Sequence, residues 1–361
     1  MKICFCIGRM SFSGAENVVR FLAESLLKRG HEVSVLLLER LPDESEYIEG
    51  LTVESAIVPG TGVKNILRRV CMERQALKRL RPDVFVIFNC EMAFSAVPAS
   101  FGLRHTKVVV CERNDPEMVP PSPKRRKLRD ILYRLAHAGV YQTERISGYF
   151  EKATPVRFVV ENPIRGRYDP CLPLAQREPV FVTVARLDDR QKNQSMLIRA
   201  FVRAAQVHPE YQLHLLGDGP DEEKYRALIR ELGAEDKVKL LGKHSAPQEY
   251  IRRCRGFVLT SEYEGMPNAL IEAMAVGLPC ISTDCGGGGA AALIQNNENG
   301  ILIDRGDEEA LTKQILRLME DETLCEKLGD AAHQINQRLD PQKVTENWET
   351  MCKTLLKGSR E

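Results

Sequence analysis

The chain has 361 residues, of which 43% are hydrophobic and 28% are charged. This length is ample for two domains with separate cores and too great for one ordinary core. The 51 basic residues nearly balance the 50 acidic ones, so composition gives no argument for nucleic-acid binding. No apolar run in the sequence reaches the ~18 residues that a membrane-spanning helix needs.

Eleven cysteines are scattered along the chain. Several fall in predicted strands, where a buried free thiol packs as a small apolar group. Apart from the weak pair Cys4 and Cys6, their spacing is not that of a zinc site, so we expect no metal. The chain opens with the strand-like segment MKICFCIG rather than a signal peptide, and we therefore expect a reducing cytoplasm.

The first half begins with a predicted β-α-β unit. A strand at residues 2–7 is followed by Ser13 and Glu16, which have the spacing of a helix capping box, and by a helix that ends before Gly30. A second strand covers residues 31–38. This opening is typical of nucleotide-binding α/β domains, although the dinucleotide fingerprint G-x-G-x-x-G is absent.

The alternation of helices and strands continues after this unit. We predict helices at residues 64–80 and 93–101, and strands at residues 83–89, 107–111, 139–143 and 156–160.

Polar residues follow the strand predicted at 107–111. Because the carboxyl ends of parallel strands border the ligand crevice, Glu112, Arg113 and Asn114 are candidate contacts for a substrate. The alternative is a solvated loop with an Asn/Asp turn ahead of Pro116.

A basic cluster lies between Pro120 and Ala136, with leucines and isoleucines interleaved at helical spacing. One interpretation is an amphipathic helix with a solvated basic face. The other is a surface that contacts anionic lipid headgroups or an anionic acceptor. The cluster consists of Lys124, Arg125, Arg126, Lys127, Arg129 and Arg134.

The region after Asn162 is rich in proline and has little periodicity, which is typical of a domain linker. We therefore predict a domain at residues 1–165, a second at 166–340, and a terminal helix at 341–361 that contains the only tryptophan, Trp348.

The second domain starts a new series of strands and helices. Its first predicted strand, residues 179–185, ends at Arg186, and Lys192 stands at the start of the next helix. Two cations at a strand end and a helix start are suited to a phosphate. The strand at 212–216 ends in Gly217 and Gly219, in a tight loop through which backbone can approach a ligand.

The segment from Thr260 to Asp284 reads as a strand end, a loop, a helix and a strand. The loop and helix start hold Glu264, Gly265, Met266, Pro267 and Asn268, and Glu272 follows within the helix. The unpaired N–H groups of a helix N-terminus form an anion site, and the two carboxylates could accept hydrogen bonds from sugar hydroxyls. The glycine-rich turn 285–289 beyond it is either a ligand-binding turn, a flexible connector or the start of a helix.

Four segments of the second half resemble the nucleotide-sugar domain of retaining glycosyltransferases of family 4. They are VARLDDRQKN, LHLLGDGP, LTSEYEGMPNALIEAMAVGLPCISTDC and NGILID, in this order within residues 184–304. The first half matches more loosely through MKICFCIGRMSFSGAENVV. The resemblance implies an α/β protein with the GT-B fold, in which two Rossmann-like domains face each other and a C-terminal helix crosses back to the N-terminal domain.

The resemblance also implies roles for single residues. Arg186 and Lys192 match the pair that holds the donor diphosphate, Glu272 the residue that binds the ribose, and Glu264 the carboxylate that meets the donor sugar. With Arg186 and Lys192, Glu264 is the expected catalytic set. Gly14 matches a loop that closes on the diphosphate.

The expected activity is transfer of a sugar, with retention, from a UDP- or GDP-sugar to a saccharide or lipid-linked saccharide acceptor in surface polysaccharide or glycolipid biosynthesis. No cofactor, no metal and no nucleic acid are expected. The expected location is the cytoplasm, with peripheral contact to the inner face of an anionic membrane through Lys124, Arg125, Arg126, Lys127 and Arg129.

Two departures from the family pattern keep alternatives open. Where many relatives have a histidine in the N-terminal domain, this chain has Cys111 to Asp115, so that Glu112, Arg113 and Asn114 are the candidate substitutes. Where relatives often place a glutamate after the glycine turn, it reads Gly289-Ala-Ala-Ala. A nucleotide-sugar 2-epimerase or hydrolase, or a non-catalytic nucleotide-sugar-binding subunit, would share the same motifs.

Overall fold

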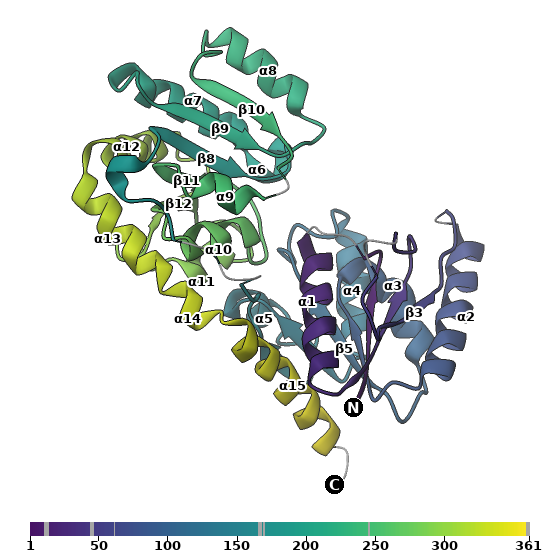
Figure 1. The fold of residues 1–361 in the computed structure, drawn as a ribbon. Helices are drawn as coiled ribbons and strands as arrows, with labels where there is room; N and C mark the ends of the chain where they lie inside the picture. The colour runs from purple at the N-terminus through teal and green to yellow at the C-terminus, as the bar shows by residue number, and fades with distance from the viewer. Residues whose placement is uncertain are drawn as a thin grey trace. The chain divides into compact units, whose positions relative to one another are not determined.

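The computed structural model describes residues 1–10, 14–43, 47–60, 62–164, 168, 170–244 and 246–358. The chain divides into two compact units, and each consists of a parallel sheet with helices packed on it (Figure 1). Unit 1 comprises Met1–Arg165 and Pro341–Glu361, and unit 2 comprises Gly166–Asp340.

The described residues of unit 1 form a seven-stranded sheet in the order β3-β2-β1-β4-β5-β6-β7, with all pairings parallel. The strands are β1 (Lys2–Ile7), β2 (Glu32–Leu37), β3 (Thr52–Ser55), β4 (Val84–Ile87), β5 (Lys107–Glu112), β6 (Ala138–Tyr141) and β7 (Arg157–Val159). The helices are α1 (Gly14–Lys28), α2 (Val63–Leu80), α3 (Cys90–Ser100), α4 (Pro123–Tyr133), α5 (Glu144–Tyr149) and α15 (Pro341–Lys357).

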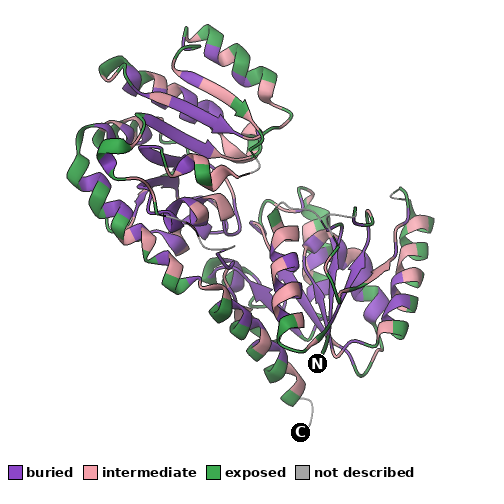
Figure 2. Cartoon of the chain, viewed as in Figure 1, coloured by how far each residue is buried: buried purple, intermediate pink, exposed green. Residues whose placement is uncertain are grey.

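The inner strands β1, β2, β4, β5 and β6 of unit 1 are buried on both faces, as Figure 2 shows by their colour, whereas the edge strands β3 and β7 are partly exposed. Alternate residues of β1 enter different hydrophobic clusters: Phe5 lies in one and Cys6 in the other. This alternation follows from the two-residue period of a strand, and burial of both faces explains its continuous apolar sequence.

The terminal helix α15 packs on unit 1 against the face that carries Phe5. Trp348 stacks on Phe88 with ring centroids 5.9 Å apart and meets Phe5 edge-on at 6.3 Å. At the rim of this contact, Arg29 of unit 1 forms ion pairs with Glu346 and Glu349 of the helix. The last 17 described helical residues are therefore part of the unit 1 core although they follow unit 2 in the sequence.

Unit 2 contains a six-stranded parallel sheet in the order β10-β9-β8-β11-β12-β13 among its described residues. The strands are β8 (Val180–Val184), β9 (Gln212–Leu216), β10 (Val238–Gly242), β11 (Gly256–Leu259), β12 (Cys280–Thr283) and β13 (Ile301–Ile303). The helices are α6 (Asp189–Lys192), α7 (Gln194–Val207), α8 (Glu222–Glu231), α9 (Pro247–Ile251), α10 (Asn268–Ala275), α11 (Gly289–Leu293), α12 (Glu308–Glu320), α13 (Glu322–His333) and α14 (Ile335–Arg338).

Both sheets have a strand at which the chain changes direction across the sheet. In unit 2, β9 lies on one side of β8 and β11 on the other, so the loops that follow β8 and β11 leave the same edge in different directions. Such a switch point is where open α/β sheets bind ligands. Strand order thus brings together two loops that are more than 70 residues apart in the sequence.

The α/β fold class predicted from the sequence is confirmed, with differences in single elements. Strand β3 and helices α5 and α6 were not predicted, and the start of α11 was one of three interpretations of the turn 285–289. Helix α3 begins at Cys90 rather than residue 93 because the side chain of Asn89 accepts a hydrogen bond from the Glu91 amide at 2.8 Å. The proposed cap Ser13 lies outside the described residues.

Candidate functional site

The centre of the candidate site is the short helix α6, which joins β8 to α7. Arg186 follows β8, and its side chain is 60% exposed and paired with Asp188. Lys192 ends α6, and its side chain is only 16% exposed. Asn193 then adopts a left-handed conformation with φ of 45°, which turns the chain from α6 into α7.

Lys192 pairs with Glu264, the first carboxylate predicted for the site. Glu264 is only 8% exposed, and the same carboxylate oxygen accepts a hydrogen bond from Ser261 Oγ at 2.9 Å. The structure therefore joins a cation and an anion that are 72 residues apart.

Further hydrogen bonds tie the loop after β11 to α6. Thr260 Oγ1 donates to the carbonyl of Lys192 at 2.8 Å, and Asn193 Nδ2 donates to Glu262 Oε1 at 2.6 Å. The Glu262 amide also donates to the carbonyl of Gln191 at 2.8 Å. The loop after β11 therefore holds the backbone of α6 at Gln191 and Lys192.

Gly217 and Gly219 have a packing role in this arrangement. A Cβ atom at Gly217 would lie 1.9 Å from the carbonyl oxygen of Ala185, and one at Gly219 would lie 2.2 Å from that of Leu187. The Leu187 amide also donates to the Asp218 carbonyl at 2.9 Å. These glycines allow the loop after β9 to lie directly against the loop that carries Arg186.

The glycine-rich turn 285–289 supports the Glu264 loop. The Glu264 amide donates to the carbonyl of Gly286 at 2.9 Å. A Cβ atom at Gly289 would lie 1.7 Å from the carbonyl oxygen of Gly265. The turn therefore leads into α11, which was one of the three interpretations of this segment. The run of four glycines was the sequence signal for this close backbone contact.

Helix α10 starts next to this support. Pro267 is its N-cap and Asn268 its first residue, while Met266 is buried and Glu272 is partly exposed one turn further on. The first turn of α10 thus follows the Glu264 loop directly, and a helix N-terminus favours anions.

A polar network that the sequence did not predict connects α6 to α7 and α8. Asp189 accepts hydrogen bonds from Ser195 Oγ at 2.9 Å and Lys224 Nζ at 2.6 Å. Burial by itself would raise the pKa of Asp189, but these donors outweigh it and lower the pKa. Tyr225 donates to Gln194 at 2.7 Å, and Gln194 donates to the Arg186 carbonyl at 3.0 Å. The loop that carries Arg186 is thus supported by hydrogen-bonded polar groups of α7 and α8.

In unit 1, the structure does not bring together the side chains of the three candidate residues at the end of β5. Glu112 is 1% exposed and faces Arg129 and Tyr133, each 3.4 Å from its carboxylate. Burial raises the pKa of Glu112 to about 7, against the opposing effect of Arg129. The Arg113 guanidinium lies over Phe88, with 4.6 Å between its carbon and the ring centroid.

Asn114 has a local role. Its side chain accepts a hydrogen bond from the Asp115 amide at 2.8 Å, and Asp115 accepts one from the Glu117 amide at 2.8 Å. This is the Asn/Asp turn that was the alternative interpretation of this segment. Gly14, the candidate at the other end of unit 1, is the first residue of α1 and has φ of +50°.

The inclusion of Arg129 among the predicted membrane-contacting residues is wrong. Its side chain is 0% exposed and donates to Glu112, to the carbonyl of Val119 at 2.6 Å and to that of Pro116 at 3.0 Å. A buried carboxylate and free carbonyls attract this arginine into the unit, whereas Lys124 and Lys127 of the same helix are exposed.

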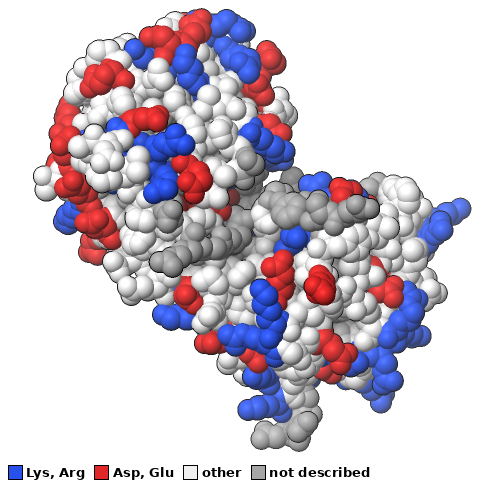
Figure 3. All heavy atoms as spheres, in the orientation of Figure 1, with Lys and Arg blue, Asp and Glu red and all other residues white. Residues whose placement is uncertain are grey.

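Basic and acidic side chains are interspersed over the visible surface of each unit (Figure 3). In the described part of the chain, no helix is long and apolar enough to cross a membrane, and no cluster of three or more His, Cys, Asp or Glu side chains could hold a metal ion.

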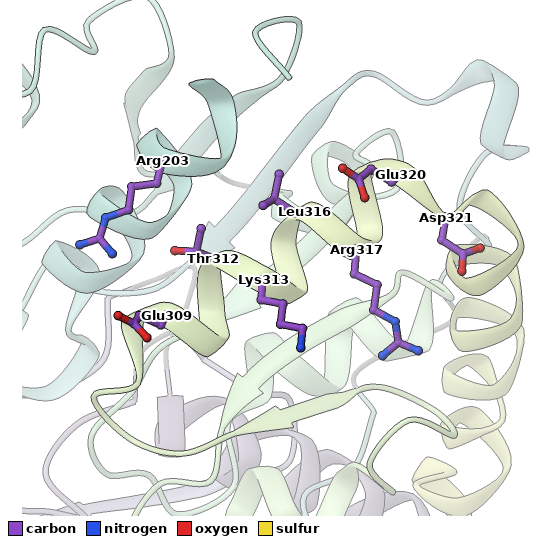
Figure 4. A pocket seen from close by; sticks show the side chains of 8 residues that line it. All are labelled: Arg203, Glu309, Thr312, Lys313, Leu316, Arg317, Glu320 and Asp321. Carbon is purple, nitrogen blue, oxygen red and sulfur yellow. The ribbon is translucent and has the colours of Figure 1, made fainter. Parts of the chain in front are cut away.

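A groove of about 620 Å³ lies on unit 2 between α7 and α12, away from the loops described above (Figure 4). Its lining mixes charges of both signs, several already engaged: Arg203 pairs with Glu308, and Arg317 donates to Asn297 at 2.9 Å. The lining residues are Arg203, Glu309, Thr312, Lys313, Leu316, Arg317, Glu320 and Asp321.

Two protein families match the chain, one for each half. Residues 167–335 match the glycosyl transferases group 1, and residues 13–148 match the glycosyl transferase 4-like domain. The first match contains α6, the glycine loops and the Glu264 segment. The second contains the strands and helices on which Glu112 to Asn114 are placed.

Individual relatives are similar over different lengths. The chain is 39% identical to the lipopolysaccharide 1,6-galactosyltransferase of Salmonella typhimurium over 153 residues, 41% of this chain and 42% of that protein. It is 25% identical to the GalNAc-alpha-(1->4)-GalNAc-alpha-(1->3)-diNAcBac-PP-undecaprenol alpha-1,4-N-acetyl-D-galactosaminyltransferase of Campylobacter jejuni over 357 residues, 96% of this chain and 97% of that protein. With four of the curated relatives it matches, the shared stretch spans only 23% to 46% of the relative's length.

Among solved structures, the fold is similar to that of Anabaena HepE in complex with UDP and glucose. The TM-score is 0.82 at 21% identity, with 98% of this chain and 99% of that chain covered. At this identity the similarity concerns the fold, which is that of the GT-B glycosyltransferases.

Proposed function

From the finding that this chain belongs to the GT4-type glycosyltransferases, with a GT-B fold, we propose that it transfers a sugar from a nucleoside-diphosphate sugar to a saccharide or lipid-linked saccharide. The donor is a UDP- or GDP-sugar, and the product belongs to surface polysaccharide or glycolipid biosynthesis. The observation that carries this proposal is the buried Lys192–Glu264 pair at the switch point of unit 2.

The names of the relatives support the choice of acceptor. One acts on lipopolysaccharide, and the name of another contains a diphospho-undecaprenol carrier. The solved neighbour with UDP and glucose supports a nucleotide-sugar donor. Galactosyltransferases and N-acetylgalactosaminyltransferases are both found among the relatives, so their names do not select one of the two sugars.

The donor site is proposed to use the groups of unit 2. Arg186 and Lys192 hold the diphosphate, Glu272 binds the ribose, and Glu264 meets the donor sugar. The amides of Gly265 and Met266, ahead of the N-terminus of α10, face the phosphate or the sugar. Gly217, Gly219, Pro267 and Asn268 shape the loops that hold these groups.

The chemistry requires stabilisation of a leaving group. Breaking the anomeric C–O bond leaves negative charge on the diphosphate, and a cation already positioned in a water-poor site stabilises that charge without reorganisation. Lys192 meets this description, because its ion pair with Glu264 holds its ammonium group in place and Ser261 in turn holds Glu264. Such a site does not require a metal or a cofactor.

We propose that the reaction retains the anomeric configuration. Glycosidases use a pair of carboxylates as acid and nucleophile. Here Glu272 is assigned to ribose and Glu264 is engaged by Lys192, so this chain offers no such pair at the proposed site. The acceptor hydroxyl attacks from the face that the diphosphate leaves, and the departing phosphate oxygen accepts its proton.

Contact with an anionic membrane is proposed through the exposed part of α4 and no longer includes Arg129. Lys124 and Lys127 are exposed beside the apolar side chains of Leu128 and Ile131, and Arg125 and Arg126 belong to the same helix. Flotation with liposomes that contain or lack anionic lipid tests this contact. A Lys124→Glu/Lys127→Glu variant that floats as well as the parent protein would exclude it.

The activity is tested by incubating the protein with UDP- and GDP-sugars and with lipid and saccharide fractions, and by separating the products. Release of nucleoside diphosphate that depends on an acceptor supports transfer. Conversion of the donor without an acceptor would indicate an epimerase or hydrolase instead. Tight donor binding without turnover on any acceptor would indicate a binding subunit.

A further inference from the structure

Arg113 is a cation whose contacts in unit 1 are incomplete. Its guanidinium carbon lies 4.6 Å from the centroid of the Phe88 ring, and Nη2 donates to Asn162 Oδ1. Within the described residues, Nη1 is buried and has no hydrogen-bond partner. A guanidinium group with a free, buried donor has capacity for one more acceptor.

The positive charge of Arg113 also has no ion-pair partner within the described residues, and Glu112 compensates it only partly. Among the described residues, the neighbouring carboxylate Glu112 is engaged on the opposite face of β5, where it meets Arg129 and Tyr133. Burial lowers the pKa of Arg113 to about 10, so that the group is still charged at neutral pH. A buried charge without an ion-pair partner destabilises the folded protein. Binding of an anion at Arg113 would offset this cost.

The position of this group is that of a ligand-binding edge. Arg113 follows β5, Gln142 follows β6 and Asn162 lies beyond β7, so the three side chains stand at the carboxyl ends of neighbouring parallel strands. Asn162 Oδ1 accepts from both Arg113 Nη2 and Gln142 Nε2, the latter at 2.9 Å. These bonds and the Phe88 ring hold the guanidinium group in place, and ligands bind to open α/β sheets at such edges.

The chemistry of the missing partner follows from the group. The guanidinium fork binds planar or tetrahedral oxyanions, because its N–H groups match the spacing of carboxylate and phosphate oxygens. Asn162, its neutral neighbour, supplies an acceptor and no charge. An anion is thus the partner that would satisfy both the free Nη1 and the net charge.

We propose that Arg113 binds an anionic group of the acceptor, either a phosphate or the carboxylate of an acidic sugar, at the carboxyl edge of the unit 1 sheet. That the bound anion belongs to the acceptor rests on the proposed function, whereas the presence of an anion site rests on the contacts of Arg113. Arg113 would then position the acceptor rather than take part in the bond changes.

Direct binding is measured in an Arg186→Ala/Lys192→Ala background, which removes the proposed diphosphate site of unit 2. Methyl phosphate and methyl glucuronide are titrated, with binding followed by calorimetry and by the thermal unfolding midpoint. We expect one of the two anions to bind, which identifies the source of the charge, and its affinity to fall at least tenfold in Arg113→Met. Equal binding with and without Arg113, or no binding of either anion, would overturn the proposal.

A second variant covers the case in which Arg113→Met does not fold. Asn162→Asp supplies a carboxylate within reach of Arg113 and keeps the acceptor that Gln142 uses. We expect this variant to unfold at a higher temperature than the parent protein and to lose anion binding. A lower unfolding temperature together with undiminished anion binding would contradict an unpaired Arg113.

The donor provides the control that separates this inference from the proposed function. UDP binding is measured in Arg113→Met within the otherwise unaltered chain and is expected to be unchanged. With an acceptor in hand, KM for the acceptor rises and KM for the donor does not. If no nucleotide sugar binds at all, the proposed function fails, while the anion titration still decides the role of Arg113.

Discussion

The strand-end loops of the two units differ in how they use charged residues. In unit 2, Lys192 and Glu264 come from different loops and meet in one ion pair. In unit 1, Glu112 and Arg113 are adjacent in the sequence and have different neighbours: Glu112 faces Arg129, whereas Arg113 lies on Phe88. Charges on separate loops converge, and charges on one strand end diverge.

The geometry of a strand explains this difference. Successive side chains of a strand point to opposite faces of the sheet, so two neighbours at a strand end cannot serve the same site. Loops that leave adjacent strands at a switch point can do so. In unit 2 the convergence also needs close backbone packing, which Gly217 and Gly289 allow.

The largest effect is expected from breaking the ion pair of unit 2. Lys192→Ala removes the cation proposed to stabilise the leaving diphosphate and should lower turnover by about 10²-fold or more, as loss of a preorganised donor does. Steady-state kinetics with the preferred donor measures it. Lys313→Ala, an exposed lysine of α12 in the same unit, is the matched control and should leave the rate unchanged. Equal rates for both variants would exclude Lys192 from the reaction.

A smaller effect is expected from disturbing the support of the Glu264 loop. Gly289→Ala places a Cβ atom 1.7 Å from the Gly265 carbonyl oxygen, and such overpacking costs roughly 1–3 kcal/mol. We expect a lower unfolding temperature of unit 2 and weaker UDP binding.

Gly148→Ala in α5 of unit 1 is the control for this substitution, because nothing lies within 4 Å of the added atom. Removal of a helical glycine should raise stability slightly, by about 0.5 kcal/mol. If Gly289→Ala were as well tolerated as Gly148→Ala, the turn would not support the loop.

A pH-dependent effect is expected from a carboxylate of unit 1 that lacks the kind of partner Glu264 has. Glu73 in α2 is fully buried, accepts from Ser95 Oγ at 2.6 Å, and has one oxygen without a partner among the described residues. Burial raises its pKa from 4.5 to about 8, opposed by Ser95 and Arg69. Between these values the folded state holds a proton that the unfolded state has lost, so stability falls as pH rises through this range.

Glu73→Gln removes this dependence, so unit 1 of the variant should gain up to about 4 kcal/mol of stability relative to the parent protein between pH 5 and pH 8.5. Urea unfolding followed by the fluorescence of Trp348 reports on unit 1, since this only tryptophan of the chain is buried there. Glu117→Gln, at an exposed position, should show the pH dependence of the parent protein. A Glu73→Gln variant with that same dependence would mean that Glu73 is already ionised at neutral pH.

Local patterns in the sequence were sufficient for the α/β alternation, and they placed the residues proposed for the donor site near strand ends and helix starts. Lys192, Glu264 and the glycine loops lie in short motifs, and each motif falls at a strand end or helix start that periodicity alone predicts. The small elements α5 and α6 were missed, because helices of four to six residues carry too little periodicity to be recognised.

Long-range contacts decided the rest. That Lys192 pairs with Glu264 depends on β8 lying beside β11, with β9 and β10 on the other side of β8. That Arg129 is buried depends on Glu112 and on free carbonyls at Pro116 and Val119, which a helical pattern does not contain. A sequence specifies which side chains carry charge and where elements begin, since these follow from local chemistry. Which charge meets which depends on strand order and packing, and these join residues that are distant in the chain.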